Sequence, residues 1–306
     1  MNHIPVLVEE FLKYAVCVSE RPVLLDGTFG RGGHSQAWLE KFPQGNVIAY
    51  DRDPEMVRIF QQEKSPYREK IQLNLGSYAE ASFPEFSFDT ILLDLGFSSL
   101  HVDTFERGFS FRYHQPLDMR YNKNEGLPVS EWINHAKEKE IAHVLREYGE
   151  EKQAYKIARS IVKARMIQKI ETTTQLKEII QNAVRTKKGK VYSDRHPYVK
   201  TFQALRIFVN QEFKHLEKAL TKLPYMLKPG GRLMVISFHS LEDRMVKQAF
   251  RRLEFQENPD PFAKSARIEG DFLLPIRKAI QPSEQEKERN RRSRSAKMRI
   301  LERKSL

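Results

Sequence analysis

The 306-residue chain contains a single cysteine, Cys17, and no long run of apolar residues. One cysteine excludes an internal disulfide framework and a zinc site built from several cysteines, and a reducing cytoplasm is the natural setting for such a chain. No stretch approaches the ~18 consecutive apolar residues that a membrane-spanning helix needs, so we expect no membrane association. The N-terminal segment MNHIPVLVEEFLKY lacks a basic region followed by an apolar block, and it therefore predicts no secretory signal.

Acidic residues are outnumbered by basic ones, with 40 Asp and Glu against 52 Lys and Arg, which gives a formal charge of +12. A protein with this excess of positive charge is often associated with polyanions, and nucleic acid is the first candidate. Hydrophobic residues make up 40% of the chain, enough for a sizeable core. The length allows one large domain or two ordinary ones.

Short apolar runs alternate with amphipathic segments in the first hundred residues. One helix is expected after Asp53, which suits an N-cap and is followed by Pro54 at the first helical position. Strands that alternate with helices at this spacing predict an α/β fold with a parallel sheet built from βαβ units. The expected buried strands are Val23 to Asp26, Val47 to Asp51, Ile71 to Leu75 and Thr90 to Asp94.

The pattern changes between residues 104 and 208, where helical spacing dominates. Ser130 is suited to cap a helix that continues to Tyr148, and apolar residues at helical spacing predict further helices over 154–162 and 176–184. A strand returns at 232–238. We therefore expect one α/β domain formed by residues 1–103 and 209–306, interrupted by a helical insertion over 104–208. The polar segment after Pro282 is expected to stay mobile until it meets a partner.

A glycine-rich loop, DGTFGRGGHS at residues 26–35, follows the first predicted strand directly. Its four glycines allow a sharp turn and a close approach to a ligand, and a helix that begins near His34 would aim its amides at that ligand. The loop lacks the Lys-Ser or Lys-Thr of a phosphate-binding P-loop, and Ser35 stands where the dinucleotide fingerprint has its third glycine. S-adenosylmethionine, which has no phosphate, is the remaining nucleoside ligand of this kind.

Two strand-end carboxylates accompany this loop. Asp51 lies 21 residues beyond Gly30, close to the ~20-residue offset at which an acid meets ribose hydroxyls, although a helix cap is an alternative role. Asp94 begins the segment Asp-Leu-Gly-Phe, which is similar to the amine-binding loop of amino-methyltransferases without its prolines. Asp94 is therefore expected either to accept a hydrogen bond from a substrate amine, with Phe97 holding the base, or to contact only the cofactor.

Ten segments, taken together and in order, resemble the RsmH/MraW family of bacterial S-adenosylmethionine-dependent methyltransferases. This resemblance implies a Rossmann-like class I methyltransferase sheet with an inserted α-helical substrate-recognition subdomain. It also implies methyl transfer to N4 of a cytidine in 16S ribosomal RNA within the small ribosomal subunit, in the cytoplasm. The segments are HIPVLVEE, DGTFGRGGHS, ILLDLGFSS, ERGFSF, PLDMR, YGEE, TFQALRI, LKPGGRL, ISFHSLEDR and NRRSRSAKMR.

The resemblance also implies individual residues of a cofactor site, whereas the catalytic role expected of Asp94 comes from the Asp-Leu-Gly-Phe segment. At position 101 this chain has His where family members commonly have Gln, so the contact would have to be made by a different donor. Tyr78 corresponds to an aromatic residue that would lie against adenine, whereas its sequence context alone is typical of a packing residue. The implied cofactor-binding residues are Gly32, Gly33, His34, Asp51, Tyr78, Asp94 and His101.

Other polar motifs leave alternatives open. His239, Glu242 and Asp243 follow the fifth strand and lack the further spacing of a metal site, so we expect a polar loop or a helix cap and no metal. Two basic runs, 185–190 and 289–299, are either solvated faces or phosphate contacts, and the net charge favours RNA. The remaining rival functions are a DNA amino-methyltransferase and a non-enzymatic ribosome assembly factor that binds the cofactor without using it.

Overall fold

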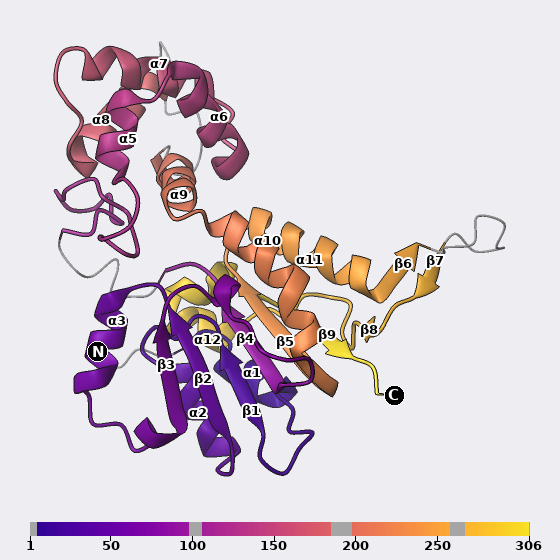
Figure 1. Ribbon diagram of the computed structural model, residues 1–306. Coiled ribbons are helices and arrows are strands. Elements are labelled where there is room, and N and C mark those ends of the chain that lie inside the picture. The colour runs from indigo at the N-terminus through magenta and orange to yellow at the C-terminus, as the bar shows by residue number, and fades with distance from the viewer. Residues whose placement is uncertain (1–4, 98–105, 185–197, 258–266, 306) are drawn as a thin grey trace. The chain divides into compact units, whose positions relative to one another are not determined.

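The computed structural model describes residues 5–97, 106–184, 198–257 and 267–305, and the statements below concern these residues. The chain divides into two compact units: residues 1–97 together with 214–306 form unit 1, and residues 98–213 form unit 2. Unit 1 contains the mixed sheet and unit 2 is helical (Figure 1). In the part of the chain that is described, no helix combines the length and the low polarity needed to cross a membrane.

A seven-stranded sheet in the order β3-β2-β1-β4-β5-β9-β8 forms the centre of unit 1. The first five strands are parallel, and β9 and β8 extend the sheet in antiparallel pairing. This confirms the predicted α/β fold class with a Rossmann-like sheet. The strands are β1 (Val23–Asp26), β2 (Asn46–Asp51), β3 (Ile71–Leu75), β4 (Phe88–Asp94), β5 (Leu227–Ser237), β8 (Phe272–Leu273) and β9 (Lys297–Arg303).

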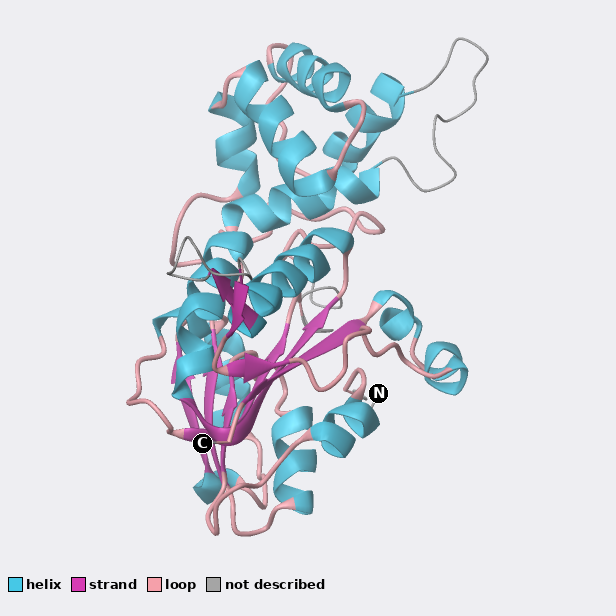
Figure 2. Cartoon of the chain, turned by 90° about the vertical axis from the view of Figure 1, so that its right-hand side faces the viewer, coloured by secondary structure: helices cyan, strands magenta, loops and turns pink. Residues whose placement is uncertain are grey.

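Apolar strand residues supply two cores, one on each face of the sheet, because a central parallel strand is covered on both sides. In β4, every residue from Phe88 to Leu93 is buried. Helices α10 (Glu212–Lys222) and α11 (Ser240–Glu254) contribute to the core that contains Leu93. Helices α1 (Val8–Tyr14), α2 (Gly33–Lys41) and α3 (Pro54–Gln62) contribute to the core that contains Leu92. Figure 2 shows helices on both sides of the sheet.

The helices of unit 1 begin and end where the sequence gives local signals. Asp53 caps α3 by accepting a hydrogen bond from the Glu55 amide at 3.0 Å, and Pro54 occupies its first turn, as predicted. A small second sheet pairs β6 (Phe255–Glu257) with β7 (Arg267–Glu269). The helices are α1 (Val8–Tyr14), α2 (Gly33–Lys41), α3 (Pro54–Gln62), α10 (Glu212–Lys222), α11 (Ser240–Glu254) and α12 (Glu284–Arg289), with short 3₁₀ turns at 68–70, 78–80, 223–226 and 291–295.

The expectation of a mobile C-terminal segment is wrong. Residues after Pro282 form α12, a 3₁₀ turn and β9, and β9 lies between β5 and β8 in the sheet. Met298 and Ile300 on this strand are buried, and Arg299 is neutralised by Asp243, with 2.6 Å between Nε and Oδ1. Tertiary partners therefore order a segment whose composition alone is typical of an unstructured tail.

Unit 2 consists of helices around its own apolar core. The single helix expected from Ser130 to Tyr148 is wrong, because the backbone is extended at Ala136 and Lys137 and two helices form. Helices were predicted correctly over 154–162 and 176–184. The helices are α5 (Val129–His135), α6 (Glu138–Gly149), α7 (Ala154–Arg165), α8 (Thr173–Val184) and α9 (Tyr198–Val209).

Candidate functional site

Three aspartates end neighbouring parallel strands of unit 1: Asp26 ends β1, Asp51 ends β2 and Asp94 ends β4. Since β1 pairs with both β2 and β4, their carboxyl ends meet at one edge of the sheet. The strand order reverses between β1 and β4, which is where open α/β sheets bind ligands. The topology therefore gathers three carboxylates at the position expected of a binding site.

Burial keeps these carboxylates from ionising as readily as they do in water. Burial raises the pKa of Asp26 to about 6. Hydrogen bonds from Ser35 and from the Thr28 amide act in the opposite direction but are weaker than the effect of burial. Burial likewise raises the pKa of Asp51 to about 7 and raises the pKa of Asp94 well above its ordinary value. The charge of Asp26 adds to both increases. Proximity of like charges and low polarity are typical of functional sites.

The glycine loop joins β1 to α2 and lies against these carboxylates. Gly30 and Gly32 have positive φ angles of 54° and 72°, a backbone conformation that residues with a Cβ rarely adopt. The Gly30 amide donates to Asp51 Oδ2 at 2.7 Å, and the Thr28 amide donates to Asp26 Oδ1 at 3.1 Å. The loop is thus tied to the ends of both β2 and β1, and its conformation depends on the two acids.

Helix α2 begins at Gly33, so its N-terminal amides open toward the loop, as predicted. A Cβ on Gly32 would lie 2.5 Å from the ring of Phe29, and a Cβ on Gly33 would collide with Pro5. Side chains are therefore excluded at both positions by close packing. At Gly30, by contrast, a Cβ would meet nothing within 4 Å, so the loop is open on this side and a ligand could approach its backbone there.

Asp51 is not the cap of α3, since Asp53 fills that role. The two oxygens of Asp51 accept from different backbone amides: Oδ2 from Gly30 and Oδ1 from Asp53, the latter at 2.8 Å. Each carboxylate oxygen has a second lone pair, so both remain able to accept from the hydroxyls of a ribose. The structure therefore removes the capping alternative for Asp51 and leaves ligand binding as a proposal.

Tyr78 lies in the 3₁₀ turn after β3 and its side chain is mostly buried, with 8% exposed. A Cβ on Gly27 would come within 2.7 Å of the Cβ of Tyr78, so the tyrosine contacts the start of the glycine loop. Sequence reasoning missed two residues behind this turn. Ser77 Oγ lies 2.8 Å from His215 Nδ1, and burial together with Arg52 lowers the pKa of His215 to about 4. A neutral His215 therefore supports the turn that carries Tyr78.

His34, in the first turn of α2, and Asp94, at the end of β4, approach each other. The Nδ1 atom of His34 is 3.8 Å from Asp94 Oδ2, and its Nε2 atom is 2.9 Å from the carbonyl oxygen of Val6. The Asp94 amide donates to the Thr28 hydroxyl at 2.6 Å, a contact that sequence reasoning missed. Among the described residues, Asp94 Oδ1 is buried and has no hydrogen-bond partner. An acceptor of this kind is costly unless a ligand supplies a donor.

The end of β5 adds a second polar group beside β4. His239 is the N-cap of α11 and accepts from the Glu242 amide, while the Glu242 carboxylate accepts from the Phe238 amide at 2.8 Å. The predicted helix cap is confirmed. Buried Glu242 also raises the pKa of Asp94 through its charge. Within the described ranges, no group of three or more His, Cys, Asp or Glu side chains is arranged to hold a metal ion.

Some predicted site residues fall elsewhere. His101 and the basic run at 185–190 lie outside the described residues. The side chain of Phe97 is 42% exposed, directly after the loop that Asp94 begins. The 289–299 run is folded. Its residue Lys297 begins β9 and pairs with Ser237, so this part of the run lies at the carboxyl end of β5, the same edge as the three aspartates. The exposed arginines of this run are Arg289, Arg291, Arg292 and Arg294.

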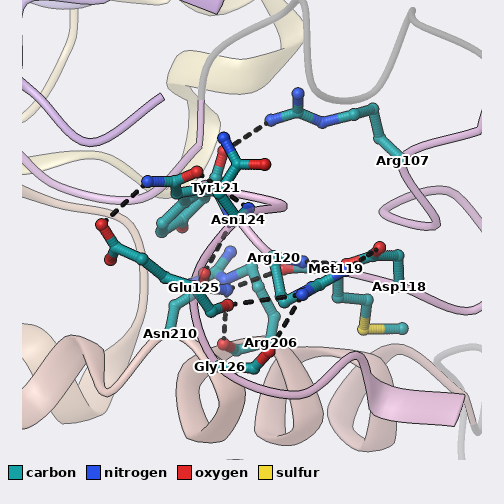
Figure 3. Close-up of polar contacts among 11 residues, drawn as sticks. Arg107, Asp118, Met119, Arg120, Tyr121, Asn124, Glu125, Gly126, Arg206 and Asn210 are labelled. Atoms are coloured by element: carbon teal, nitrogen blue, oxygen red, sulfur yellow. Dashed lines mark hydrogen bonds and ion pairs between the residues drawn. The ribbon is translucent and has the colours of Figure 1, made fainter. Parts of the chain in front are cut away.

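Two of the motif segments in unit 2, ERGFSF and PLDMR, form one polar cluster (Figure 3). The Arg107 guanidinium donates to the Tyr121 carbonyl at 2.9 Å, and the Met119 amide donates to the Arg107 carbonyl at 2.9 Å. Arg120 binds Asp118 through both Nε and Nη2, at 2.8 and 2.9 Å. Asn210 at the end of α9 donates to the Met119 carbonyl at 2.7 Å. These contacts fix the loop that precedes α5.

Comparisons with known proteins agree over nearly the whole chain. The family model described as the MraW methylase family matches residues 1–304. A protein of Methylobacillus flagellatus named "Ribosomal RNA small subunit methyltransferase H" is 43% identical over 99% of this chain and 94% of its own length. Proteins with the same name from Thioalkalivibrio sulfidiphilus and Trichodesmium erythraeum are 44% and 40% identical, over 98% and 99% of this chain and 97% and 99% of their own lengths.

Proposed function

Since the chain belongs to the MraW methylase family, we propose that it transfers a methyl group from S-adenosylmethionine to N4 of a cytidine in small-subunit (16S) ribosomal RNA. The observation that carries this proposal is the match over residues 1–304, together with relatives at 40–44% identity that are named as small-subunit ribosomal RNA methyltransferases. The protein is a methyltransferase with a Rossmann-like sheet, and S-adenosylmethionine is its methyl donor.

The carboxyl edge of the sheet fits this donor. The backbone amides of Gly32 and Gly33, at the start of α2, would bind the amino-acid portion, and the two acceptor oxygens of Asp51 would bind the ribose hydroxyls. The buried Oδ1 of Asp94 has no hydrogen-bond partner among the described residues, and a bound ligand or a substrate amine would supply the donor. When bound, S-adenosylmethionine provides an electrophilic methyl group on a positively charged sulfur.

We assign the remaining contacts from the position of each residue at the same edge of the sheet. His34, in the first turn of α2, lies close to Asp94. Tyr78 lies against the start of the glycine loop, where it would meet the adenine. His101 completes the proposed set from the family resemblance. The proposed cofactor-binding residues are therefore Gly32, Gly33, His34, Asp51, Tyr78, Asp94 and His101.

Asp94 is the proposed catalytic residue. The N4 amine of cytidine is a weak nucleophile because its lone pair is conjugated with the base ring. A carboxylate that accepts a hydrogen bond from this amine would orient the nitrogen toward the methyl group and stabilise the positive charge that develops on it. Burial raises the pKa of Asp94 in the ligand-free protein, and the positive charge of a bound sulfonium would favour its ionised form. To reach this edge, the cytidine must leave its stack in the RNA.

The RNA is proposed to contact the exposed arginines of the 289–294 segment, which lies at the same edge as Asp94, and the surface of unit 2. The formal charge of +12 supports a polyanionic partner. The proposed substrate is ribosomal RNA within an assembled or nearly assembled small subunit, in the cytoplasm. Unit 2 is proposed to recognise this substrate.

Mass spectrometry of small-subunit ribosomal RNA from cells with and without the protein tests the proposed function. We expect one cytidine to lose an N4 methyl group when the protein is absent. Unchanged ribosomal RNA with a change in DNA methylation would instead indicate a DNA amino-methyltransferase. Unchanged methylation of both, with defective small subunits that a variant unable to bind S-adenosylmethionine restores, would indicate an assembly factor.

A further inference from the structure

The outer face of α7 in unit 2 carries a run of basic residues that the sequence motifs did not include. From Lys152 to Lys169 the chain has six Lys and Arg residues and no Asp or Glu. The core-facing residues Ala154, Ile157, Ala158 and Ile161 are 0–2% exposed, so one side of the helix is fixed against the rest of unit 2. The opposite side is therefore the solvent-facing surface of α7 (Figure 1).

Helical geometry aligns the exposed basic residues. At about 100° per residue, positions 156, 159 and 163 of α7 lie within one narrow stripe opposite the core-facing residues, and Lys152 lies in the turn directly before the helix. All four of these side chains are exposed. Arg165 does not belong to the stripe, because it turns inward and donates to the carbonyls of Ile133 and Ala136 at 2.7 Å. We call Lys152, Tyr155, Lys156, Arg159, Lys163 and Met166 the α7 stripe.

Acidic residues do not neutralise most of the α7 stripe. Arg159 lies 3.6 Å from Glu138. Within the described part of the chain, none of Lys152, Lys156 and Lys163 is paired with a carboxylate. Lys156 and Lys163 therefore lie roughly 10 Å apart along the helix, at about 1.5 Å per residue, and Lys152 adds a third ammonium group in the turn before it. A row of unneutralised positive charge complements a phosphate backbone.

Three large apolar side chains on or beside the α7 stripe are unusually exposed to solvent. Met166 is 82% exposed, Ile167 is 90% exposed and Tyr155 is 58% exposed, which makes them three of the four most exposed large hydrophobic residues among those described. Large apolar groups of this exposure commonly belong to interaction surfaces. An aromatic ring beside lysines is the combination that binds unpaired nucleotides, because the base stacks on the ring while the phosphates meet the cations.

We propose that the α7 stripe binds an RNA segment, with phosphates on Lys152, Lys156 and Lys163 and an unpaired base stacked on Tyr155. This inference rests on the proposed function in one respect, namely that RNA is the substrate. The repulsion between like charges disfavours a second copy of this chain as the partner. The uniform positive charge also favours RNA over a protein partner, since protein surfaces mix both signs.

Binding measurements on full-length variants test this proposal, with deproteinised small-subunit ribosomal RNA and intact small subunits as the two probes. The variant Lys152→Gln/Lys156→Gln/Lys163→Gln should bind deproteinised RNA roughly 10- to 100-fold more weakly, and the slope of log K against log[salt] should fall by about 2–3. The control Lys123→Gln/Lys139→Gln/Arg146→Gln removes the same charge from other exposed positions in unit 2. It should retain most of the affinity and of the slope.

A second pair of variants tests the stacked base. Tyr155→Ala should weaken RNA binding by about 5- to 150-fold without changing the salt slope, since stacking contributes ~1–3 kcal/mol per base, whereas Tyr155→Phe should bind normally. Circular dichroism should show native helix content in each variant.

Equal affinity of the stripe and control variants would overturn the proposal. Weaker binding to intact subunits with unchanged binding to deproteinised RNA would also overturn it, because the stripe would then contact a ribosomal protein. Methyl transfer is measured separately: we expect a higher KM and an unchanged kcat for the stripe variant. If the unaltered protein does not transfer a methyl group, the proposed function is contradicted. The comparison of RNA affinities between the stripe and control variants would still test the role of the stripe, because it does not depend on methyl transfer.

Discussion

His34 Nδ1 and Asp94 Oδ2 lie 3.8 Å apart at the carboxyl edge of the sheet, too far for a direct hydrogen bond. The Val6 carbonyl only accepts, so the hydrogen bond at Nε2 of His34 places a proton on that nitrogen and turns Nδ1 toward Asp94. The other oxygen of the same carboxylate, Oδ1, is buried and has no hydrogen-bond partner among the described residues. We propose that this oxygen accepts a hydrogen bond from the target amine.

Asp94→Asn should separate a catalytic role from a cofactor-binding role. The substitution keeps the shape of the side chain but removes its charge, so it weakens the acceptor that holds the target amine. We expect turnover to fall about 10²- to 10⁴-fold, the range for positioned proton-transfer groups, with a smaller change in S-adenosylmethionine affinity. Single-turnover methylation at saturating cofactor measures this directly. A near-normal rate there would restrict Asp94 to cofactor binding.

Asp51→Ala should weaken binding of both S-adenosylmethionine and S-adenosylhomocysteine by about 10- to 150-fold. This loss corresponds to ~1.5–3 kcal/mol for a charge-assisted acceptor, and the Gly30 amide loses its partner as well. The matched control is Asp53→Ala, which removes the cap of α3 two residues away. It should reduce stability by about 1 kcal/mol and leave cofactor affinity nearly unchanged. Calorimetry that finds normal affinity in Asp51→Ala would remove this residue from the site.

The ligand-free protein should lose stability as the pH rises from about 4 to 7. The folded-state pKa values of Asp26 and Asp51 are raised to about 6 and about 7, whereas an unfolded aspartate titrates near pH ~3.9. The folded state therefore holds more protons in this window, and its stability must fall as the pH increases. For Asp51 alone the loss is on the order of 2–4 kcal/mol, at ~1.4 kcal/mol per pKa unit.

Chemical denaturation at several pH values between 5 and 8 measures this effect. Asp51→Asn removes one of the carboxylates whose pKa is raised, so its stability should depend less on pH between 5 and 7 than that of the unaltered protein. Identical pH dependence of the two proteins would show that Asp51 titrates normally.

The C-terminal segment should contribute to RNA binding only as part of a folded domain. Truncation after Pro282 removes β9, which pairs with β5 over residues 232–237, so the shortened chain should fail to fold. Replacement of the exposed arginines at 289, 291, 292 and 294 with glutamine should instead preserve the fold and weaken RNA binding. Thermal unfolding and salt-dependent RNA binding distinguish the two variants. An unchanged salt slope for the glutamine variant would show that these arginines do not contact phosphate.

The strands β1 to β4 could be predicted to within two residues, because each apolar run ends in a polar residue or a turn, whereas β5 begins at Leu227, five residues before the predicted start at 232. The ends of β1, β2 and β4 are Asp26, Asp51 and Asp94, and the same residues mark the site. Asp53 and Pro54 likewise fix the start of α3 by local geometry. These features depend on short-range chemistry that is readable in the sequence.

Features that depend on distant partners could not be predicted. β9 has a charged composition that becomes compatible with a sheet only because Asp243 and Arg232 neutralise Arg299 and Glu302. Thr28 and His215 join the site through contacts with residues 66 and 138 positions away. The break between α5 and α6 does have a local signal, since Glu140 accepts from the Lys137 amide as a capping residue does.

The most direct test of the account is to incubate the purified protein and S-adenosylmethionine with small ribosomal subunits from cells that lack this enzyme, and then to identify the methylated nucleoside by mass spectrometry. We expect N4-methylcytidine at one site of the small-subunit ribosomal RNA, formed by the unaltered protein and almost absent with Asp94→Asn. A methyl group on another base or another atom, or no methyl transfer to the RNA, would contradict the proposed function.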